Sequence, residues 1–286
     1  IGSSSGSTTL ASGKTISIGS SGFAADYLTL RSFTQSGSTA QTLTLTSTAV
    51  INIISSTFNG DLTVSSPGFL LKNSTFNGTS SFTRTGSSGN HQSDGGNTFN
   101  GSVTVDNSGS SGRIRFATVT PDVYNGNATF NSSGGQDVQI AYSGDNLFAG
   151  AITINSNKVV FNTASGKVTF TGGNAQTLNG SYNFPFKKLA IYKSDGYVTS
   201  NATFSVDDTL FFIKGSFITK STNELTLKLN SKVVGASDSS HVQGPAKKIG
   251  NTAFIFPTGA NNSYRPIEMS APSTTTSEFT GEYVED

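Results

Sequence analysis

The feature that most constrains the fold is a three-residue turn sequence, an aromatic residue followed by Asn and Gly, which returns at intervals along the chain. Three copies are identical and three are variants. The copies are Phe58-Asn59-Gly60, Phe76-Asn77-Gly78, Phe99-Asn100-Gly101, Tyr124-Asn125-Gly126, Phe148-Ala149-Gly150 and Leu178-Asn179-Gly180. Their glycines are separated by 18, 23, 25, 24 and 30 residues. Self-similarity at this period indicates a stack of similar units rather than one globular core.

Short strand patterns lie between these turns. Alternating triplets follow most of the glycines, at residues 62–64, 103–105, 128–130, 152–154 and 182–184. In each triplet the first and third side chains point to one side and the middle Thr or Asn to the other. The N-terminal part has similar strand patterns without the turn sequence, at residues 15–18, 27–30, 42–45 and 51–54. Gly recurs too often for a helix, so each coil of about 24 residues is expected to hold two or three strands.

Two architectures accommodate such strands, a sandwich or barrel of antiparallel hairpins and a parallel β-solenoid. In a solenoid each coil lies ~4.8 Å above the previous one, so that equivalent residues stack. The repeated turn therefore favours an all-β fold, a parallel β-helix or solenoid of about ten coils over residues 1–235. The aromatic residues would form an internal column, the Asn residues a ladder at a corner, and the Gly residues would provide positive φ.

Composition excludes several classes of protein. Charged residues make up 12% of the chain and the net charge is +1, with no basic run longer than two lysines. A nucleic-acid partner is therefore not expected, because it would require a basic face. No apolar segment approaches the ~20 residues of a membrane helix. The chain has no Cys, which excludes disulfides, thiolate metal sites and Cys nucleophiles.

The pattern changes near the C-terminus. Residues 236–286 no longer repeat and are interrupted by Gly-Pro and Pro-Thr-Gly turns. They are expected to be the start of a β-sandwich-like module or a solenoid cap, truncated at residue 286. The first residue is Ile, and no secretion signal follows it, so we expect a fragment of a longer protein or a mature product.

Residues 241–259, followed by Tyr-Arg-Pro-Ile at 264–267 and Phe-Thr-Gly-Glu-Tyr at 279–283, resemble a module of very large surface proteins of gliding and environmental Bacteroidetes. The upstream Phe-Asn-Gly coils are similar to repeats that precede that module. The resemblance implies a cell-surface adhesin exported by the type IX route, of the gliding-motility type. It implies an extracellular location, with glycans or surfaces and the secretion or motility machinery of the outer membrane as partners. It supplies no catalytic residues.

Few residues suggest chemistry. His91 has a loop sequence around it and is expected to be solvated, and His241 to make a structural hydrogen bond. A polysaccharide-cleaving solenoid enzyme would need carboxylates near Lys or Arg on adjacent coils. Asp207 and Asp208 are neighbours and would point to opposite faces. Arg113 and Arg115 share one face, but no carboxylate is expected one coil away.

Other sites remain open possibilities at this stage. No cofactor is expected, although five aspartates in turn-like sequence suggest a structural calcium site, namely Asp94, Asp106, Asp122, Asp137 and Asp145. Thr209 follows Asp208 and precedes Leu210, which matches the pattern at which Bacteroidetes attach O-glycans. Outward Thr arrays such as residues 42–46 suggest ice binding, but the outward Thr changes to Asn or Ser between coils. The sequence thus predicts a structural or adhesive protein and not an enzyme, with a carbohydrate-active solenoid enzyme as the alternative.

Overall fold

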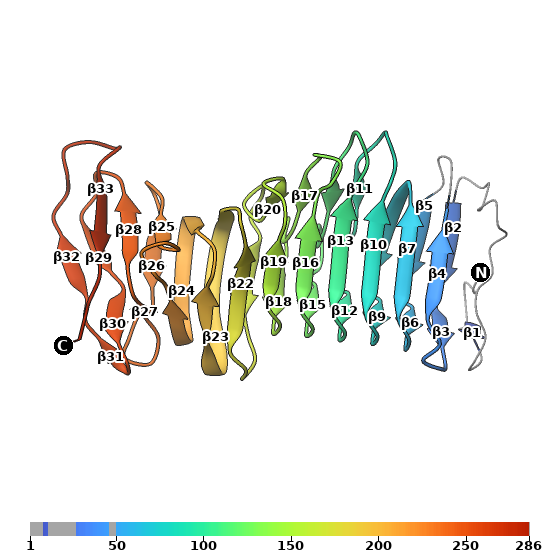
Figure 1. The fold of residues 1–286 in the computed structure, drawn as a ribbon, viewed down its shortest axis with the longest axis horizontal. Coiled ribbons are helices and arrows are strands. Elements are labelled where there is room, and N and C mark those ends of the chain that lie inside the picture. The colour runs from blue at the N-terminus through green and yellow to red at the C-terminus, as the bar shows by residue number, and fades with distance from the viewer. Residues whose placement is uncertain (1–7, 11–26, 46–49, 286) are drawn as a thin grey trace.

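The computed structural model describes residues 8–10, 27–45 and 50–285. These residues form a parallel β-solenoid of about ten turns without a helix, which confirms the predicted fold class. Figure 1 shows a rod with β2 near one end and β33 near the other. Within the described ranges, no helix is long and apolar enough to cross a membrane. The strand expected at residues 15–18 lies outside them.

Each coil runs along three sides, which we name the first, second and third faces in chain order. The strands of the first face are β2 (Tyr27–Arg31), β5 (Val50–Ile54), β8 (Gly68–Lys72), β11 (His91–Gln92), β14 (Ile114–Arg115), β17 (Val138–Gln139), β20 (Val159–Val160), β25 (Leu225–Leu227) and β28 (Ala246–Ile249). Those of the second face are β1 (Thr8–Leu10), β3 (Phe33–Gln35), β6 (Thr57–Phe58), β9 (Thr75–Phe76), β12 (Thr98–Phe99), β15 (Val123–Tyr124), β18 (Asp145–Phe148), β21 (Lys167–Phe170) and β26 (Lys232–Val234).

The strands of the third face complete each coil. They are β4 (Gln41–Thr44), β7 (Leu62–Ser66), β10 (Ser80–Arg84), β13 (Val103–Asn107), β16 (Ala128–Asn131), β19 (Ile152–Ile154), β22 (Gln176–Gly180), β27 (Val242–Gln243) and β30 (Thr258–Ala260). Between β22 and β25 the long strands β23 (Phe184–Ser200) and β24 (Phe204–Ile218) each bend around all three faces. Neighbouring coils pair in parallel throughout these series.

Alternation along each strand builds the core. In β7, Leu62 and Val64 are buried whereas Thr63 between them is exposed. Because the coils stack in register, each inward side chain packs against its equivalents in the coils above and below. A core of this kind is narrow, so a chain that is only 34% hydrophobic can fill it.

The corner between the first and second faces contains a buried polar ladder. In each coil one side-chain oxygen accepts a hydrogen bond from the backbone N–H of its equivalent one coil earlier. The distances from the backbone nitrogen to the side-chain oxygen are 3.2 Å for Ser56 to Ser74, 3.1 Å for Ser74 to Asn97, 2.9 Å for Asn97 to Asp122 and 3.3 Å for Asp122 to Asn146. All five residues are buried. The ladder satisfies backbone donors that the sharp corner removes from the strand pairing.

Left-handed backbone conformation recurs at the corner that carries this ladder. The non-glycine residues with positive φ there are Ser32, Ser55, Asn73, Ala117 and Ala141, with φ between 48° and 53°. This corner therefore requires a left-handed turn in coil after coil, whereas Gly60, Gly78, Gly101, Gly126 and Gly150 of the aromatic corner have no positive φ.

The stacking continues past residue 235, where the sequence suggested a boundary. β28 pairs in parallel with β25, and β30 pairs in parallel with β27. Three short antiparallel pairs then end the rod, formed with β29 (Phe254–Phe256), β31 (Ser263–Tyr264), β32 (Ile267–Met269) and β33 (Glu278–Gly281). The predicted boundary between residues 235 and 236 thus does not coincide with a break in the stacking. β28 and β30 pair both with the preceding coil and with the antiparallel cap.

Candidate functional site

The aromatic residues of the repeated turn form a continuous internal column, as the sequence predicted. Consecutive ring centroids are 5.9 Å apart for Phe58 and Phe76, and 5.0 Å apart for Phe76 and Phe99. The next steps are 5.0 Å to Tyr124 and 4.4 Å to Phe148. Neighbouring rings lie within 12° of parallel, and all are buried. This column stabilises the corner through stacking in addition to burial.

The Asn residues form the predicted ladder on the outside of the same corner. The Nδ2 of Asn77 donates to Oδ1 of Asn59, Asn100 donates to Asn77, and Asn125 donates to Asn100, each at 2.7 Å. These side chains are exposed or half-buried, so the ladder presents a row of hydrogen-bonding groups to solvent.

The assignment of Leu178-Asn179-Gly180 to this corner is wrong. These residues lie in β22 on the third face, where Leu178 is opposite Ile152 and Asn179 is opposite Thr153. The Nδ2 of Asn201 donates to Oδ1 of Asn179 at 2.9 Å, one coil further on. A Leu-Asn-Gly sequence alone does not specify the corner, because Leu also occupies inward positions of the third face.

The corner of that coil is Phe170-Thr171-Gly172. Phe170 is opposite Phe148, and the N–H of Thr171 donates to the carbonyl of Phe148 at 2.8 Å. Thr replaces Asn, which concealed this copy. The distance of 22 residues from Gly150 to Gly172, which is closer to the other coil lengths than 30, is the signal that would have identified it.

The glycines of the corner are required for a different reason from the one predicted. Gly172 has a positive φ of 81°, but Gly60, Gly78, Gly101, Gly126 and Gly150 do not. Instead, each packs directly on the backbone of the coil before it. A Cβ on Gly101 would lie 2.2 Å from the carbonyl oxygen of Gly78, and one on Gly126 would lie 2.3 Å from that of Gly101. Close approach of two backbones therefore excludes any side chain.

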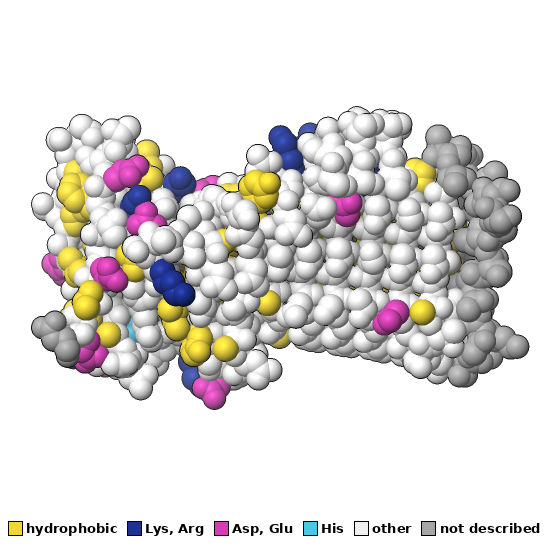
Figure 2. All heavy atoms as spheres, in the orientation of Figure 1, with side chains coloured by type: hydrophobic (Ala, Val, Ile, Leu, Met, Phe, Trp, Pro, Cys, Tyr) yellow, Lys and Arg dark blue, Asp and Glu magenta, His cyan; other side chains and the backbone are white. Residues whose placement is uncertain are grey.

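The third face presents a row of hydroxyl side chains, which we call the hydroxyl row. Its members are opposite one another in successive strands, and they are Thr42, Thr63, Ser81, Thr104, Thr129 and Thr153. All six are exposed or half-buried. Figures 1 and 2 look onto this face, and Figure 2 shows mostly uncharged side chains and backbone over β4 to β19.

A parallel outward row two residues further on is less uniform. It consists of Thr44, Ser65, Thr83, Asp106 and Asn131. The change of side chain in this row agrees with the sequence argument against ice binding, which would need an extended array of Thr. The face as a whole is flat, polar and almost uncharged.

The five aspartates considered for calcium have separate environments. Asp94 pairs with Lys72 at 2.7 Å, Asp145 with Lys167 at 2.9 Å, and Asp106 accepts from the Ser133 hydroxyl at 2.6 Å. Among the described residues, no group of three His, Asp or Glu side chains is placed to hold a metal ion. The turn aspartates thus act individually, each in its own coil.

Asp122 is the buried acid of the polar ladder. Desolvation raises the pKa of its carboxyl from 3.8 to about 7, against the lowering effect of hydrogen bonds from Asn97. Its Oδ2 has no partner in the part of the chain that the structure describes, and neither has the hydroxyl of Tyr124. Burial, and secondarily the charge of Asp122, raise the pKa of Tyr124. Asp122 thus occupies a position that suits a neutral side chain.

Three buried cations were not anticipated from the sequence, namely Arg84, Lys193 and Lys248. The ammonium of Lys248 donates to the carbonyls of Lys228 and Leu229 at 2.6 and 3.0 Å. Lys193 binds the carbonyl of Thr171 at 3.0 Å and Oε1 of Gln176. Desolvation lowers the pKa of both lysines to about 8.

These cations act on turns. Arg84 binds the carbonyls of Ser88 and Gly89 at 3.0 Å and Oδ1 of Asn107 at 3.0 Å. Each cation thus donates to backbone carbonyls at turns, and these hydrogen bonds offset the cost of its burial.

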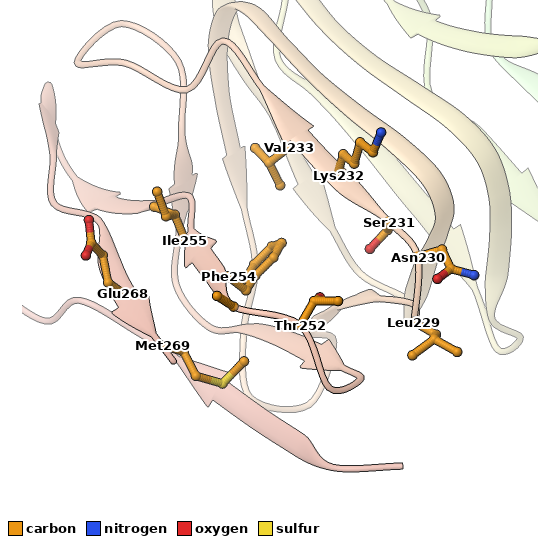
Figure 3. A pocket seen from close by; sticks show the side chains of 11 residues that line it. Leu229, Asn230, Ser231, Lys232, Val233, Thr252, Phe254, Ile255, Glu268 and Met269 are labelled. Carbon is orange, nitrogen blue, oxygen red and sulfur yellow. The ribbon is translucent and has the colours of Figure 1, made fainter. Parts of the chain in front are cut away.

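A groove of about 750 Å³ lies between β26 and β29 (Figure 3). In earlier coils the strands of the second face pair with each other, whereas β29 pairs with β32 instead of β26. Val233, Phe254 and Met269 line the groove, and Lys232 and Glu268 lie at its margins. The displacement of β29 therefore opens an apolar hollow beside the cap.

The remaining predicted residues are structural. His91 is half-buried against Gly68 rather than solvated, and desolvation followed by the charge of Arg84 lowers its pKa. His241 is buried with Nδ1 3.0 Å from the carbonyl of Ser237, as expected of a structural hydrogen bond.

Thr209 is a poor candidate for O-glycosylation of the folded chain. Its side chain is buried at 8% exposure, and its hydroxyl donates to Oδ1 of Asp208 at 2.8 Å. Asp207 and Asp208 both lie half-buried at the corner of β24 where the pairing with β23 shifts register, and Asp207 accepts from Asn162 at 2.8 Å. These two carboxylates therefore have separate structural partners.

The expectation that no carboxylate lies one coil from Arg113 is wrong. Ile114 is opposite Val138, which places Asp137 in register with Arg113. The lengths of the intervening loops determine this register, and the sequence alone did not show them.

Comparisons with known proteins give no relative: the chain matches no protein-family model, no curated protein and no solved structure.

Proposed function

We propose that this chain is a structural and adhesive segment of a secreted surface protein, and that its third face contacts glycans or solid surfaces. The observation that carries the proposal is the hydroxyl row, which continues in register over six coils from Thr42 to Thr153. Hydroxyls repeat along it at the strand spacing of ~4.8 Å. A flat, periodic and polar surface of this kind suits contact with another extended polar surface.

The energetics of such contact favour a repeat protein. Each hydroxyl contributes little when it exchanges water for a partner, about 1 kcal/mol or less. Many equivalent contacts on one rigid rod act together, because the first contact brings the others to high effective concentration. Additional coils lengthen the rod without requiring a new core. The low charge makes the attraction insensitive to salt.

The resemblance of residues 241–283 to Bacteroidetes surface modules supports the biological setting that we propose. In this setting the segment belongs to a longer chain exported by the type IX route and located at the cell surface. Its partners are then glycans or surfaces, together with the secretion or motility machinery of the outer membrane. Calcium and O-glycans are not part of the proposal.

The test compares two sets of outward hydroxyls on different faces. Thr63→Val, Thr104→Val and Thr129→Val together remove the centre of the hydroxyl row. The control set on the second face is Thr57→Val, Thr75→Val and Thr98→Val, whose side chains are also in register. Adsorption to cellulose, mica and a glycan array should fall for the first set only. Equal adsorption by both sets and the unmodified chain would contradict the proposal.

The enzymatic alternative has one observation in its favour, the position of Asp137 one coil from Arg113. Hydrolysis by paired carboxylates requires a second acid about 5 to 9.5 Å away. An assay for new reducing or unsaturated chain ends on acidic and neutral polysaccharides tests this alternative directly.

A further inference from the structure

Two successive loops between the third and first faces share a sequence, and the loop of the next coil also has a left-handed glycine. Residues 86–90 read Gly-Ser-Ser-Gly-Asn, and residues 109–113 read Gly-Ser-Ser-Gly-Arg. Gly89, Gly112 and Gly135 have φ of 78°, 81° and 75°. A Cβ on Gly112 would lie 1.7 Å from the carbonyl oxygen of Gly89, so the loops stack closely. Bare backbone therefore forms the floor of this region.

The loops enclose a polar groove of about 420 Å³. Its side chains come from four successive coils and include Asn90, Ser111, Arg113, Gln136, Asp137 and Lys158. Strand registers place four of them in one column, because His91 is opposite Ile114, Ile114 opposite Val138, and Val138 opposite Val159. The preceding residues form the column Asn90, Arg113, Asp137 and Lys158.

The charged side chains that line this groove are two cations, Arg113 and Lys158, and one carboxylate, Asp137. Asp137 accepts from Gln139 at 3.3 Å, and Gln139 accepts from Arg115 at 2.8 Å. The guanidinium of Arg115 also lies 4.6 Å from the centre of the Tyr142 ring. The carboxylate of Asp137 and the nearby guanidinium of Arg115, which does not line the groove, are thus held in a network within the protein.

The other two cations are free to bind a ligand. In the described part of the chain, neither the guanidinium of Arg113 nor the ammonium of Lys158 has a hydrogen bond or an ion pair. They lie two coils apart, which corresponds to about 10 Å. In Figure 2, dark blue side chains gather at the edge of the rod where Figure 1 places the loops near β17 and β20.

We propose that this groove binds an anionic polysaccharide that runs across the coils. The two free cations would hold carboxylate or sulfate groups on nearby sugar units through charge-assisted hydrogen bonds. Asn90, Ser111 and Gln136 offer donors and acceptors for the sugar hydroxyls, and the glycine floor lets a sugar ring approach the backbone. Two free cations are too few for a nucleic acid, whose binding depends on many phosphate contacts.

This inference rests on the proposed adhesive role and names the ligand class of a second surface, distinct from the hydroxyl row. The variants are Arg113→Gln and Lys158→Gln, singly and together, with Lys214→Gln and Arg265→Gln as exposed control cations elsewhere. The probes are polygalacturonate and alginate for carboxylates, dextran sulfate for sulfates, and neutral dextran and cellulose.

The unmodified chain should bind at least one anionic polymer more tightly than neutral dextran, and 1 M salt should abolish the difference. Each single change should raise Kd by about threefold to tenfold, and both together by tenfold or more. The control variants should bind as the unmodified chain does. Tighter binding to polygalacturonate and alginate than to dextran sulfate would identify carboxylate as the group that the groove recognises. The opposite preference would identify sulfate.

Equal binding by the double variant and the unmodified chain would overturn this proposal. Cellulose binding that persists in that case, and that depends on the hydroxyl row, leaves the adhesive role intact. Absence of binding to every polymer and surface would overturn both proposals. Cleavage of an anionic polymer that is lost with Asp137→Asn would overturn a purely binding role for the groove.

Discussion

Replacement of Asp122 by Asn should stabilise the protein at alkaline pH. Asn is close in shape to a protonated Asp, and Asn97 and Asn146 occupy the equivalent ladder positions in the neighbouring coils. In the Asp122→Asn variant the amide oxygen can still accept from the backbone N–H of Asn97, as the carboxyl Oδ1 does in the unmodified chain. The substitution therefore keeps the ladder and removes a buried negative charge.

The size of the effect follows from the pKa of Asp122. A folded-state pKa of about 7, compared with 3.8 for an unperturbed carboxyl, corresponds to about 4 kcal/mol at about 1.4 kcal/mol for each tenfold change. The folded state holds the proton of Asp122 more tightly than the unfolded state does. Protonation of Asp122 therefore makes its full contribution to the unfolding free energy below pH 3.8. It is lost as the pH rises from 3.8 to about 7, and it stays lost above that pH.

Urea denaturation followed by circular dichroism measures this effect at pH 4 and pH 8. Asp122→Asn should match the unmodified protein at pH 4 and exceed its unfolding free energy by up to about 4 kcal/mol at pH 8. Asp61→Asn is the matched control, because Asp61 is exposed and its Oδ1 also accepts a backbone N–H one coil away, at 2.8 Å from Thr79. A gain for Asp122→Asn that is the same at both pH values, or a loss at pH 8, would refute the reasoning.

Three further substitutions test the packing of the corners and turns. Gly101→Ala should lower the unfolding free energy by about 3 kcal/mol in urea denaturation, because its Cβ would meet the Gly78 carbonyl. The control Gly135→Ala has no atom within 4 Å of its Cβ, so it should cost only about 1 kcal/mol of backbone strain. Asn100→Ala removes two hydrogen bonds of the exposed ladder and should cost about 1 kcal/mol; a thermal melt that is unchanged would show that the ladder does not stabilise the corner. Lys193→Met leaves turn carbonyls without a donor and should cost about 3 kcal/mol, compared with little effect for Lys214→Met on the surface, as measured by the urea midpoint.

The repeated aromatic-Asn-Gly turn was visible in the sequence because the same side chains perform the same role in successive coils. The copy at Phe170 was missed because Thr171 replaces Asn there. The buried polar ladder left no such signal, since Ser56, Asn97 and Asp122 differ in type and share only an oxygen acceptor.

Two other features depend on geometry that residue types do not specify. The left-handed corner accepts Ser, Asn and Ala, because its neighbours hold the backbone in place, so no single residue type marks it. The column that contains Arg113, Asp137 and Lys158 follows from the register of adjacent coils, which depends on the lengths of the loops between them.

The hydroxyl row is the central element of this account, and a single distance tests its register. The chain contains no Cys, so Thr63→Cys with Thr153→Cys provides two unique sites for nitroxide spin labels. These positions lie four coil steps apart through β10, β13 and β16, which predicts a backbone separation of about 19 Å. A single distance distribution centred near this value supports a continuous row. A distribution whose centre differs from this value by more than the two label arms can account for would contradict a continuous row, as would several separate distances.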